Sequence, residues 1–297
     1  MTPTLSVLIP FYQDDPTPLL RSLSNQCDVD GEIEIRLMDD GSGDPALTRR
    51  VTAAVDRMDL RTTFTTVPGN RGRAATRNAL QEQSEANWIL FLDADMRIDH
   101  TDFLRRYLEL IATDKADIVF GGFTVEDRAL DRDTDLHRVL SRSSDCLDAA
   151  SRNRAGPQFV ASSNLCVRRR VLTENPFDPA FSGWGWEDSE WAARVGSSHR
   201  LVHIDNPAVH LGLESTDTLL SRFATSGPNY RRFVERHPEL ARSLPLFRIV
   251  TRLRHVPGHG LLRWPLKMLV KLRLLPTRLR VLALKLWRAS HYAEAMR

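Results

Sequence analysis

Short apolar runs alternate with helical patterns through the first 120 residues of the chain, and this alternation most constrains its fold. Between the runs, Asp44-Pro45 offers a helix N-cap followed by proline, and residues 103–111 repeat apolar side chains near the helical period. Such alternation predicts an α/β fold, a mostly parallel sheet flanked by helices on both faces. The runs typical of buried strands occupy residues 5–10, 33–38, 62–67, 88–92 and 117–120.

The rest of the chain continues the pattern less regularly. We expect a helix around Leu136 and Leu140, a strand over 159–167, a helix over 187–195 and a strand over 201–204. Residues 216–236 predict a helix interrupted at Gly227-Pro228. Ligands of open α/β sheets bind beyond the carboxyl ends of the strands, so the strand ends should carry the chemistry.

Composition narrows the class of protein. Hydrophobic residues make up 42% of the 297 residues and charged residues 27%, which excludes disorder as a global description. Cys27, Cys146 and Cys166 lack C-x-x-C spacing, which excludes a disulfide scaffold or a cysteine-rich zinc site and predicts a cytoplasmic protein. No apolar run reaches the ~18 residues that span a bilayer, and a strand beginning near residue 4 leaves no room for a signal peptide.

Charge is distributed unevenly along the chain. Residues 241–297 hold 13 Lys and Arg against one acid, Glu294, whereas the other 240 residues hold 28 against 37. Between 248 and 288, leucines are interleaved with Lys and Arg and no acid occurs, and prolines at 257, 265 and 276 should divide the segment into short helices. A basic amphipathic helical tail predicts that residues 245–290 lie on an anionic membrane surface. The alternatives are packing on its own domain or on a second subunit; leucines outnumber stacking aromatics, so nucleic acid is not an expected partner.

Two strand ends carry acids. Asp93 and Asp95 stand one residue apart after an apolar strand, and alternate residues of an extended chain face the same side. Two carboxylates there could seat a hard divalent cation, although a solvated turn would have the same pattern. Asp39 and Asp40 end another strand, where either could instead cap the following turn. Acids at matching ends of parallel strands would surround one crevice.

A glycine-rich segment at 69–78 places Arg73 and Arg77 four residues apart, on one face of a helix that should begin near Gly72. A helix N-terminus with guanidinium groups suits a phosphate or a nucleobase edge. The segment is neither a Walker loop nor a dinucleotide-binding fingerprint.

The most specific segment runs from residue 181 to 191 and contains Gly-Trp-Gly-Trp-Glu-Asp. Trp184 and Trp186 offer flat apolar faces for sugar rings, Gly185 allows close backbone approach, and Glu187 and Asp188 open a helix. The alternative is an acid-capped helix after a packed aromatic turn. Further on, His210 follows a short strand; it is either a structural histidine or a ligand of the suspected metal.

Together these segments resemble the GT-A glycosyltransferases, specifically the inverting enzymes of glycosyltransferase family 2. The resemblance covers roughly residues 4–215 in the family's order. The Gly-Trp-Gly-Trp-Glu-Asp stretch is also similar to a segment of animal β-1,4-galactosyltransferases and bacterial chondroitin-type polymerases. The matching stretches are residues 6–12, 39–42, 70–78, 93–95 and 183–190, with His210.

The resemblance implies a role for each matching residue. A catalytic domain over 1–240 would bind a nucleotide-diphosphate sugar in its first half, about 1–120, and the acceptor in its second, about 121–240. Asp188 would be the catalytic base, and Asp95 and His210 would hold Mn²⁺ or Mg²⁺. The residues implied to contact the donor are Pro10, Tyr12, Asp39, Asp40, Asn70, Arg73, Arg77, Asp93 and Asp95. Those implied to contact the sugar or acceptor are Ser163, Trp184, Gly185, Trp186 and Glu187.

The sequence therefore predicts an inverting, metal-dependent glycosyltransferase. Its donor would be UDP-hexose or UDP-N-acetylhexosamine, and its acceptor a glycan linked to polyprenyl diphosphate, used for bacterial surface polysaccharide. The enzyme would lie on the inner face of the cytoplasmic membrane. The alternative is a non-catalytic nucleotide-sugar or glycan-binding subunit of a polysaccharide-synthesis complex.

Overall fold

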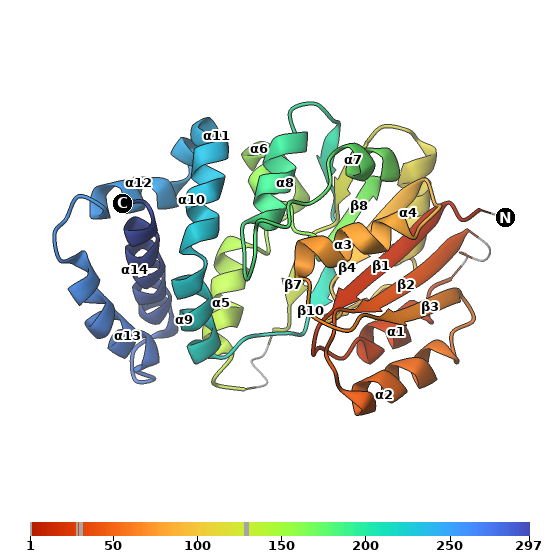
Figure 1. The fold of residues 1–297 in the computed structure, drawn as a ribbon, viewed down its shortest axis with the longest axis horizontal. Coiled ribbons are helices and arrows are strands. Elements are labelled where there is room, and N and C mark those ends of the chain that lie inside the picture. The colour runs from red at the N-terminus through yellow and green to blue at the C-terminus, as the bar shows by residue number, and fades with distance from the viewer. Residues whose placement is uncertain (1, 28, 30–31, 128–130) are drawn as a thin grey trace.

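The computed structural model describes residues 2–27, 29, 32–127 and 131–297 (Figure 1). Within them the strands form a seven-stranded sheet, in the order β3-β2-β1-β4-β8-β6-β9, and a three-stranded sheet, in the order β5-β10-β7. The large sheet contains β1 (Leu5–Phe11), β2 (Ile33–Asp39), β3 (Arg61–Thr66), β4 (Trp88–Leu92), β6 (Ile118–Phe120), β8 (Asn164–Arg168) and β9 (Leu201–His203). The small sheet contains β5 (Met96–Arg97), β7 (Phe123–Val125) and β10 (Ala208–His210).

The large sheet is mostly parallel, as the alternation predicts. β1 pairs in parallel with both β2 and β4, and among the described strands of this sheet only β8 runs antiparallel to its neighbours. The prediction of a strand over 159–167 is wrong for residues 159–163. A 3₁₀ turn, η1 (Pro157–Phe159), comes first, and β8 begins only at Asn164; in between, the Ser162 amide donates to the Asp188 side chain rather than to a neighbouring strand.

The helices before residue 240 cover both faces of the large sheet or stand beside it (Figure 1). The predicted break at Gly227-Pro228 is confirmed, since one helix ends at Thr225 and the next begins at Gly227. Asp44 caps its helix as expected, its side chain accepting from the Ala46 amide at 2.8 Å. The bounds are α1 (Thr17–Leu23), α2 (Pro45–Val55), α3 (Arg73–Glu82), α4 (Phe103–Ala112), α5 (Asp135–Ser144), α6 (Ala149–Ala155), α7 (Arg169–Glu174), α8 (Glu187–Val195), α9 (Thr216–Thr225), α10 (Gly227–Arg236) and α11 (Pro238–Ser243).

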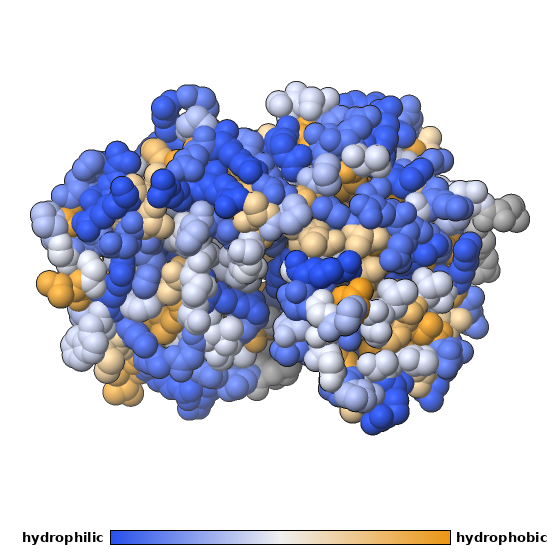
Figure 2. Space-filling view, in the orientation of Figure 1, coloured by the Kyte–Doolittle hydropathy of each residue, from blue (hydrophilic) through white to orange (hydrophobic). Residues whose placement is uncertain are grey.

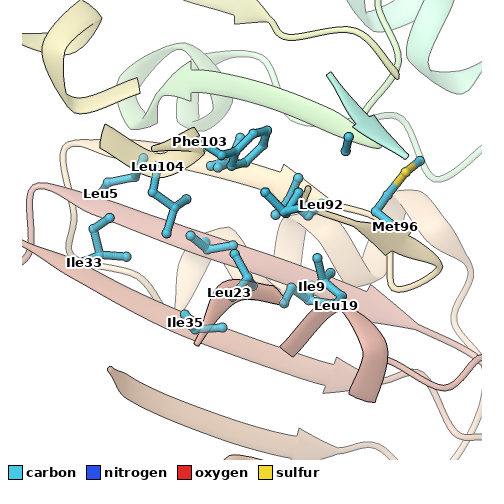
Figure 3. Packing of buried hydrophobic residues seen from close by; sticks show 14 of the residues in the cluster. Leu5, Ile9, Leu19, Leu23, Ile33, Ile35, Leu92, Met96, Phe103 and Leu104 are labelled. Carbon is cyan, nitrogen blue, oxygen red and sulfur yellow. The ribbon is translucent and has the colours of Figure 1, made fainter. Parts of the chain in front are cut away.

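Two hydrophobic clusters fix the sheet between its helices. Alternate residues of β1, such as Leu5 and Ile9, pack with Leu19 and Leu23 of α1 and with Phe103 of α4 (Figure 3). The opposite face packs against α3, α7 and α8. Burial of both faces explains why the strands are continuous apolar runs rather than alternating ones.

The tail contains α12 (Pro245–Leu253), η2 (His259–Leu262), α13 (Arg263–Lys271) and α14 (Thr277–Ala295). Pro265 does not break a helix, because it lies in the first turn of α13, where its missing amide hydrogen needs no partner. α14 is long, at 19 residues, rather than short. In the described part of the chain, no helix combines the length and the apolar character needed to cross a membrane.

The tail packs on the rest of the chain through α14. Tyr292 and Ala289 share a buried cluster with Tyr230 and Phe233 of α10, and Trp287 packs near α9. The division at residue 240 stays a prediction, but these shared clusters bind α14 to the helices before it. α13 packs mainly on α14 and therefore keeps an exposed face, and α12 has an exposed face as well.

Candidate active site

A cavity of about 490 Å³ opens beyond the carboxyl ends of β1, β2 and β4. The edge of the sheet predicted to carry the chemistry therefore does form a pocket. Of the residues singled out from the sequence, the following line it: Pro10, Tyr12, Asp40, Asn70, Arg73, Arg77, Asp93, Asp95 and Trp184.

Asp40 joins two loops at the edge of this cavity. Its carboxylate accepts hydrogen bonds from the backbone amides of Arg71 (3.1 Å) and Gly72 (2.9 Å), and so orders the turn before α3. Gly41 has a φ of +81°, and a Cβ there would lie 2.5 Å from the Gly69 backbone. A side chain at residue 41 would therefore push the two loops apart.

Asp39, the less favoured of the two acids for donor contact, lies apart from the cavity that Asp40 lines. Its carboxylate accepts from the amide (2.9 Å) and the hydroxyl (2.5 Å) of Ser42, so it caps the turn after β2. It lines a different cavity, together with Asp44 and Thr66. Two adjacent acids leave a strand on opposite sides, and the sequence alone does not say which one faces the ligand.

Arg77 is the buried cation that connects the strand-end acids to α8. Its side chain is 2% exposed; Nη2 donates to Asp93 Oδ1 at 3.2 Å, while Nη1 lies 3.6 Å from Asp188 Oδ1 and 3.7 Å from Glu187 Oε1. Burial alone would lower the pKa of Arg77, but the three carboxylates, Asp188 first, raise it. Arg73 reaches toward Glu187 from the exposed end of α3, at 3.9 Å.

Glu187 and Asp188 begin α8 but have different surroundings. Burial and the neighbouring charge of Asp188 raise the pKa of Glu187 above its ordinary value, despite Arg77. Asp188 is partly exposed, and its Oδ2 accepts from both the amide and the hydroxyl of Ser162 at 3.0 Å. These two bonds fix one oxygen of Asp188 and leave Oδ1 without a hydrogen-bond donor in the described structure.

Asp95 and His210, which the resemblance implies as metal ligands, lie in contact in the structure. β10 pairs antiparallel with β5, so His210 stands opposite Met96 and its Nε2 lies 3.1 Å from Asp95 Oδ2. Although burial raises the pKa of Asp95, the hydrogen bond and charge of His210 lower it overall; burial lowers the pKa of His210, but Asp95 raises it overall.

The pair fits a divalent cation that is also bound by a ligand. Asp95 Oδ1 is buried without a partner, and a Cβ at Gly212 would lie 1.9 Å from Oδ2, so the space beside the carboxylate depends on glycine. Among the described residues, no group of three His, Cys, Asp or Glu side chains could hold a metal alone. A carboxylate and an imidazole, completed by diphosphate oxygens, suit Mn²⁺ or Mg²⁺.

The two tryptophans of the Gly-Trp-Gly-Trp segment have different roles. Trp184 lines the cavity, its ring edge-on to Phe223 at 5.1 Å. Trp186, predicted to contact substrate, does not line the cavity: its ring packs with α10 and α14, where its Nε1 donates to the Tyr292 hydroxyl at 3.1 Å. Gly185 also stays outside the cavity lining; its carbonyl accepts from Asn229 at 3.0 Å.

Ser163, predicted to border the sugar site, follows Ser162, which binds Asp188, and its own backbone contacts Asp93. It is buried, its carbonyl accepts from the Asp93 amide at 3.3 Å, and its hydroxyl has no hydrogen-bond partner in the described structure. Buried polar atoms are rarely left unpaired. Ser163 Oγ, Asp95 Oδ1 and Asp188 Oδ1 are thus three such atoms around one region, which indicates a site that binds a polar ligand.

The structure adds cavity residues that the sequence did not identify. Asp14 lines the pocket just after β1; burial and the charge of Asp95 raise its pKa. Its place three residues beyond a strand end could have indicated it. Arg222 also lines the pocket, with its guanidinium 5.9 Å from the Trp184 ring centre and an ion pair to Glu214. Nothing in the local pattern of α9 marks it.

Comparisons with known proteins identify the family of this chain. Residues 6–175, more than half of the chain, match the model of a family described as "Glycosyl transferase family 2". A curated protein of Rhizobium meliloti (strain 1021), "N-acetylglucosaminyltransferase", is 33% identical over 98 residues, which are 32% of this chain and 23% of that protein. The match therefore spans about a quarter of that relative's length.

Solved structures resemble the whole chain. Residues 1–349 of Staphylococcus aureus TarS (16% identity, TM-score 0.55) align over 98% of this chain and 90% of theirs. The mannosyltransferase PcManGT of Pyrobaculum calidifontis, in complex with GDP-Man and Mn²⁺ (18%, TM-score 0.60), aligns over 98% and 86%. At these identities the likeness shows the fold, which is the predicted GT-A arrangement. With its family match and this fold, the chain belongs to glycosyl transferase family 2.

Proposed function

We propose that this glycosyltransferase moves a hexose or N-acetylhexosamine from a UDP-sugar to a glycan hydroxyl, with inversion at the anomeric carbon. The observation that carries the proposal is the position of Arg77, which contacts Asp93 on the cation side of the cavity and Asp188 on the α8 side. The proposed donor-binding edge of the sheet and the candidate base, Asp188, are therefore separated by about the width of one guanidinium group. Such proximity is what a displacement reaction requires.

The donor proposal draws on relatives of different specificity. S. aureus TarS has been solved with UDP and with UDP-GlcNAc, the P. calidifontis enzyme with GDP-Man and Mn²⁺, and the Rhizobium relative is named for N-acetylglucosamine. In this chain, Asp40 and Asn70 would border the nucleobase and Arg73 the diphosphate, because all three line the cavity near the start of α3. Uridine is favoured over guanosine by the family resemblance.

Asp95 and His210 would hold the cation. A bound Mn²⁺ or Mg²⁺ neutralises charge on the departing diphosphate, which lowers the barrier to its release. The protein adds Arg73, at the N-terminus of α3, as a second source of positive charge on the same side of the cavity.

Asp188 would accept the proton of the attacking hydroxyl. An alcohol is far too weakly acidic to ionise near neutral pH, so a positioned carboxylate must take its proton as the new bond forms. Oδ1 is free of hydrogen-bond donors in the described structure, while Ser162 holds Oδ2 and Arg77 stabilises the anion. Attack opposite the leaving diphosphate converts an α-linked donor into a β-linked product.

The acceptor side would be formed by Trp184, Glu187 and Ser163. Trp184 lines the cavity with an apolar ring, and the Glu187 carboxyl offers hydrogen-bonding oxygens to a sugar hydroxyl. We propose a lipid-linked glycan of a bacterial surface polysaccharide as the acceptor, extended on the cytoplasmic side. The presence of three free cysteines in the structure is compatible with that compartment.

A donor panel tests the proposal. Purified protein, with Mn²⁺ and a range of glycan acceptors, should release nucleoside diphosphate from one UDP-sugar and yield a heavier product by mass spectrometry. Asp188→Asn should lose at least about a hundredfold in kcat, the usual contribution of a general base, yet still bind UDP. Asp102→Asn, at a comparably exposed carboxylate before α4, should retain activity. UDP binding without turnover on any acceptor would favour the non-catalytic subunit.

A further inference from the structure

Exposed apolar side chains are concentrated in one part of this molecule. Of the twelve large hydrophobic residues exposed in the described chain, eleven lie between 249 and 282, and the other, Tyr12, lines the cavity. Leu261 is 82% exposed, Trp264 72% and Leu274 92%. Figure 2 shows hydrophobic residues on the surface at the end of the molecule where Figure 1 draws α13. Exposed apolar side chains concentrated in this way are typical of a binding surface.

The apolar side chains of α13 lie on two sides of the helix, one buried against the protein and the other exposed to solvent. Val270 is buried toward α14, whereas Trp264, Met268 and Leu272 repeat every four residues and are all exposed. The helix is therefore anchored by one side and presents an apolar stripe on another. We define the α13 surface as Leu261, Trp264, Lys267, Met268, Leu272 and Leu274.

Positive charge flanks the stripe. Lys267 lies on α13, and Arg278 lies in the first turn of α14; both are exposed, and neither has a carboxylate partner in the described part of the chain. No acid occurs between Glu239 and Glu294. Two neighbouring cations, Lys271 and Arg273, do pair with acids of the body, Asp217 and Asp133.

We propose that the α13 surface docks on an anionic phospholipid bilayer, with Trp264 and the leucines among the acyl-chain boundary and the cations at the headgroups. Indole and long aliphatic side chains beside Lys and Arg are the chemistry of interfacial helices. A second copy of the chain is a poorer occupant, because it would bring like charges such as Lys267 and Arg278 together. The anionic headgroups would supply the negatively charged partners that Lys267 and Arg278 lack in the described part of the chain.

Vesicle flotation of the full chain tests this without reference to catalysis. The wild type should float with vesicles of phosphatidylcholine and phosphatidylglycerol in equal amounts, but not with phosphatidylcholine alone, and salt should weaken its binding. The double variant Lys267→Glu/Arg278→Glu should bind at least about thirtyfold more weakly, since each cation at such a surface contributes about fivefold. Arg21→Glu/Arg57→Glu changes the net charge equally at exposed sites on α1 and after α2, and should bind as the wild type does.

The apolar stripe needs its own variant. Trp264→Ser/Met268→Ser should weaken flotation by about tenfold or more while leaving the melting temperature and UDP binding unchanged, because both side chains are exposed. Equal weakening by Arg21→Glu/Arg57→Glu would reduce the effect to net charge and overturn the proposal. So would a wild type that does not bind anionic vesicles, or a dimer in solution that Trp264→Ser/Met268→Ser dissociates.

Discussion

Replacing Arg77 by methionine should destabilise this protein more than most single changes. The guanidinium is buried with three carboxylate oxygens within 3.2 to 3.7 Å, and Glu187 and Asp188 are adjacent in the chain. Methionine fills similar space but leaves these acids without their shared cation. Removing one partner of a buried ion pair typically costs about 3–5 kcal/mol, and we expect a loss of that size in the free energy of unfolding.

The loss should depend on pH in a defined direction. The pKa of Glu187 is already raised, and without Arg77 it should rise further. An acid whose folded pKa exceeds its unfolded value binds more protons in the folded state, so it destabilises the protein above that pKa and does so less as pH falls. Arg77→Met should therefore recover part of its lost stability between about pH 7 and about pH 5.

Urea denaturation followed by tryptophan fluorescence, at both pH values, measures this. Arg57→Met, at an exposed arginine after α2, should change stability by no more than about 0.5 kcal/mol. Arg77→Lys keeps the charge but not the fork that reaches three acids, so its loss should be intermediate. A loss below about 1 kcal/mol for Arg77→Met, or a loss that grows toward low pH, would refute the reasoning.

Three other changes should have measurable effects. Tyr292→Phe removes the acceptor of the Trp186 indole bond and should cost about 1–3 kcal/mol in unfolding free energy, measured by urea denaturation; an unchanged value would mean that this bond does not support the loop before α8. Burial lowers the pKa of His203 from 6.5 to about 4, so the wild type should lose up to about 3 kcal/mol as pH falls through that interval; His203→Phe should flatten this slope in thermal melts, and an identical slope would contradict the assignment. Gly212→Ala should displace the Asp95 carboxylate and weaken Mn²⁺ binding in the presence of UDP by about ten- to a hundredfold in calorimetry, whereas unaltered affinity would exclude Asp95 as a ligand.

The sequence predicts the sheet and its chemical edge well, for a local reason. Strands buried on both faces are continuous apolar runs, and residues directly after them must lie at the sheet's rim. Asp40, Asp93 and Asp95 all follow such runs, so their positions in the sequence suffice to predict a shared crevice. All three line the cavity, which confirms that prediction.

The errors come from contacts between segments far apart in the chain. A tryptophan in a glycine-rich turn is typical of a sugar-binding surface, but Trp186 lies outside the cavity lining and is hydrogen-bonded to Tyr292, 106 residues away. Arg222 enters the cavity from a helix whose sequence carries no signal of it. The packing of α14 is of the same kind: its basic, leucine-rich pattern fits a membrane face and a buried face equally well, and tertiary contacts decide between them.

Electron paramagnetic resonance of Mn²⁺ tests the central claim most directly, because the signal of free Mn²⁺ disappears when the ion is bound. Titrated with Mn²⁺ and UDP together, the wild type should bind about one ion per chain, as expected for a single carboxylate–imidazole pair completed by diphosphate. Asp95→Asn/His210→Asn should bind none and should lose turnover. Equal Mn²⁺ binding by that variant, or wild-type turnover undiminished under exhaustive chelation, would contradict the account.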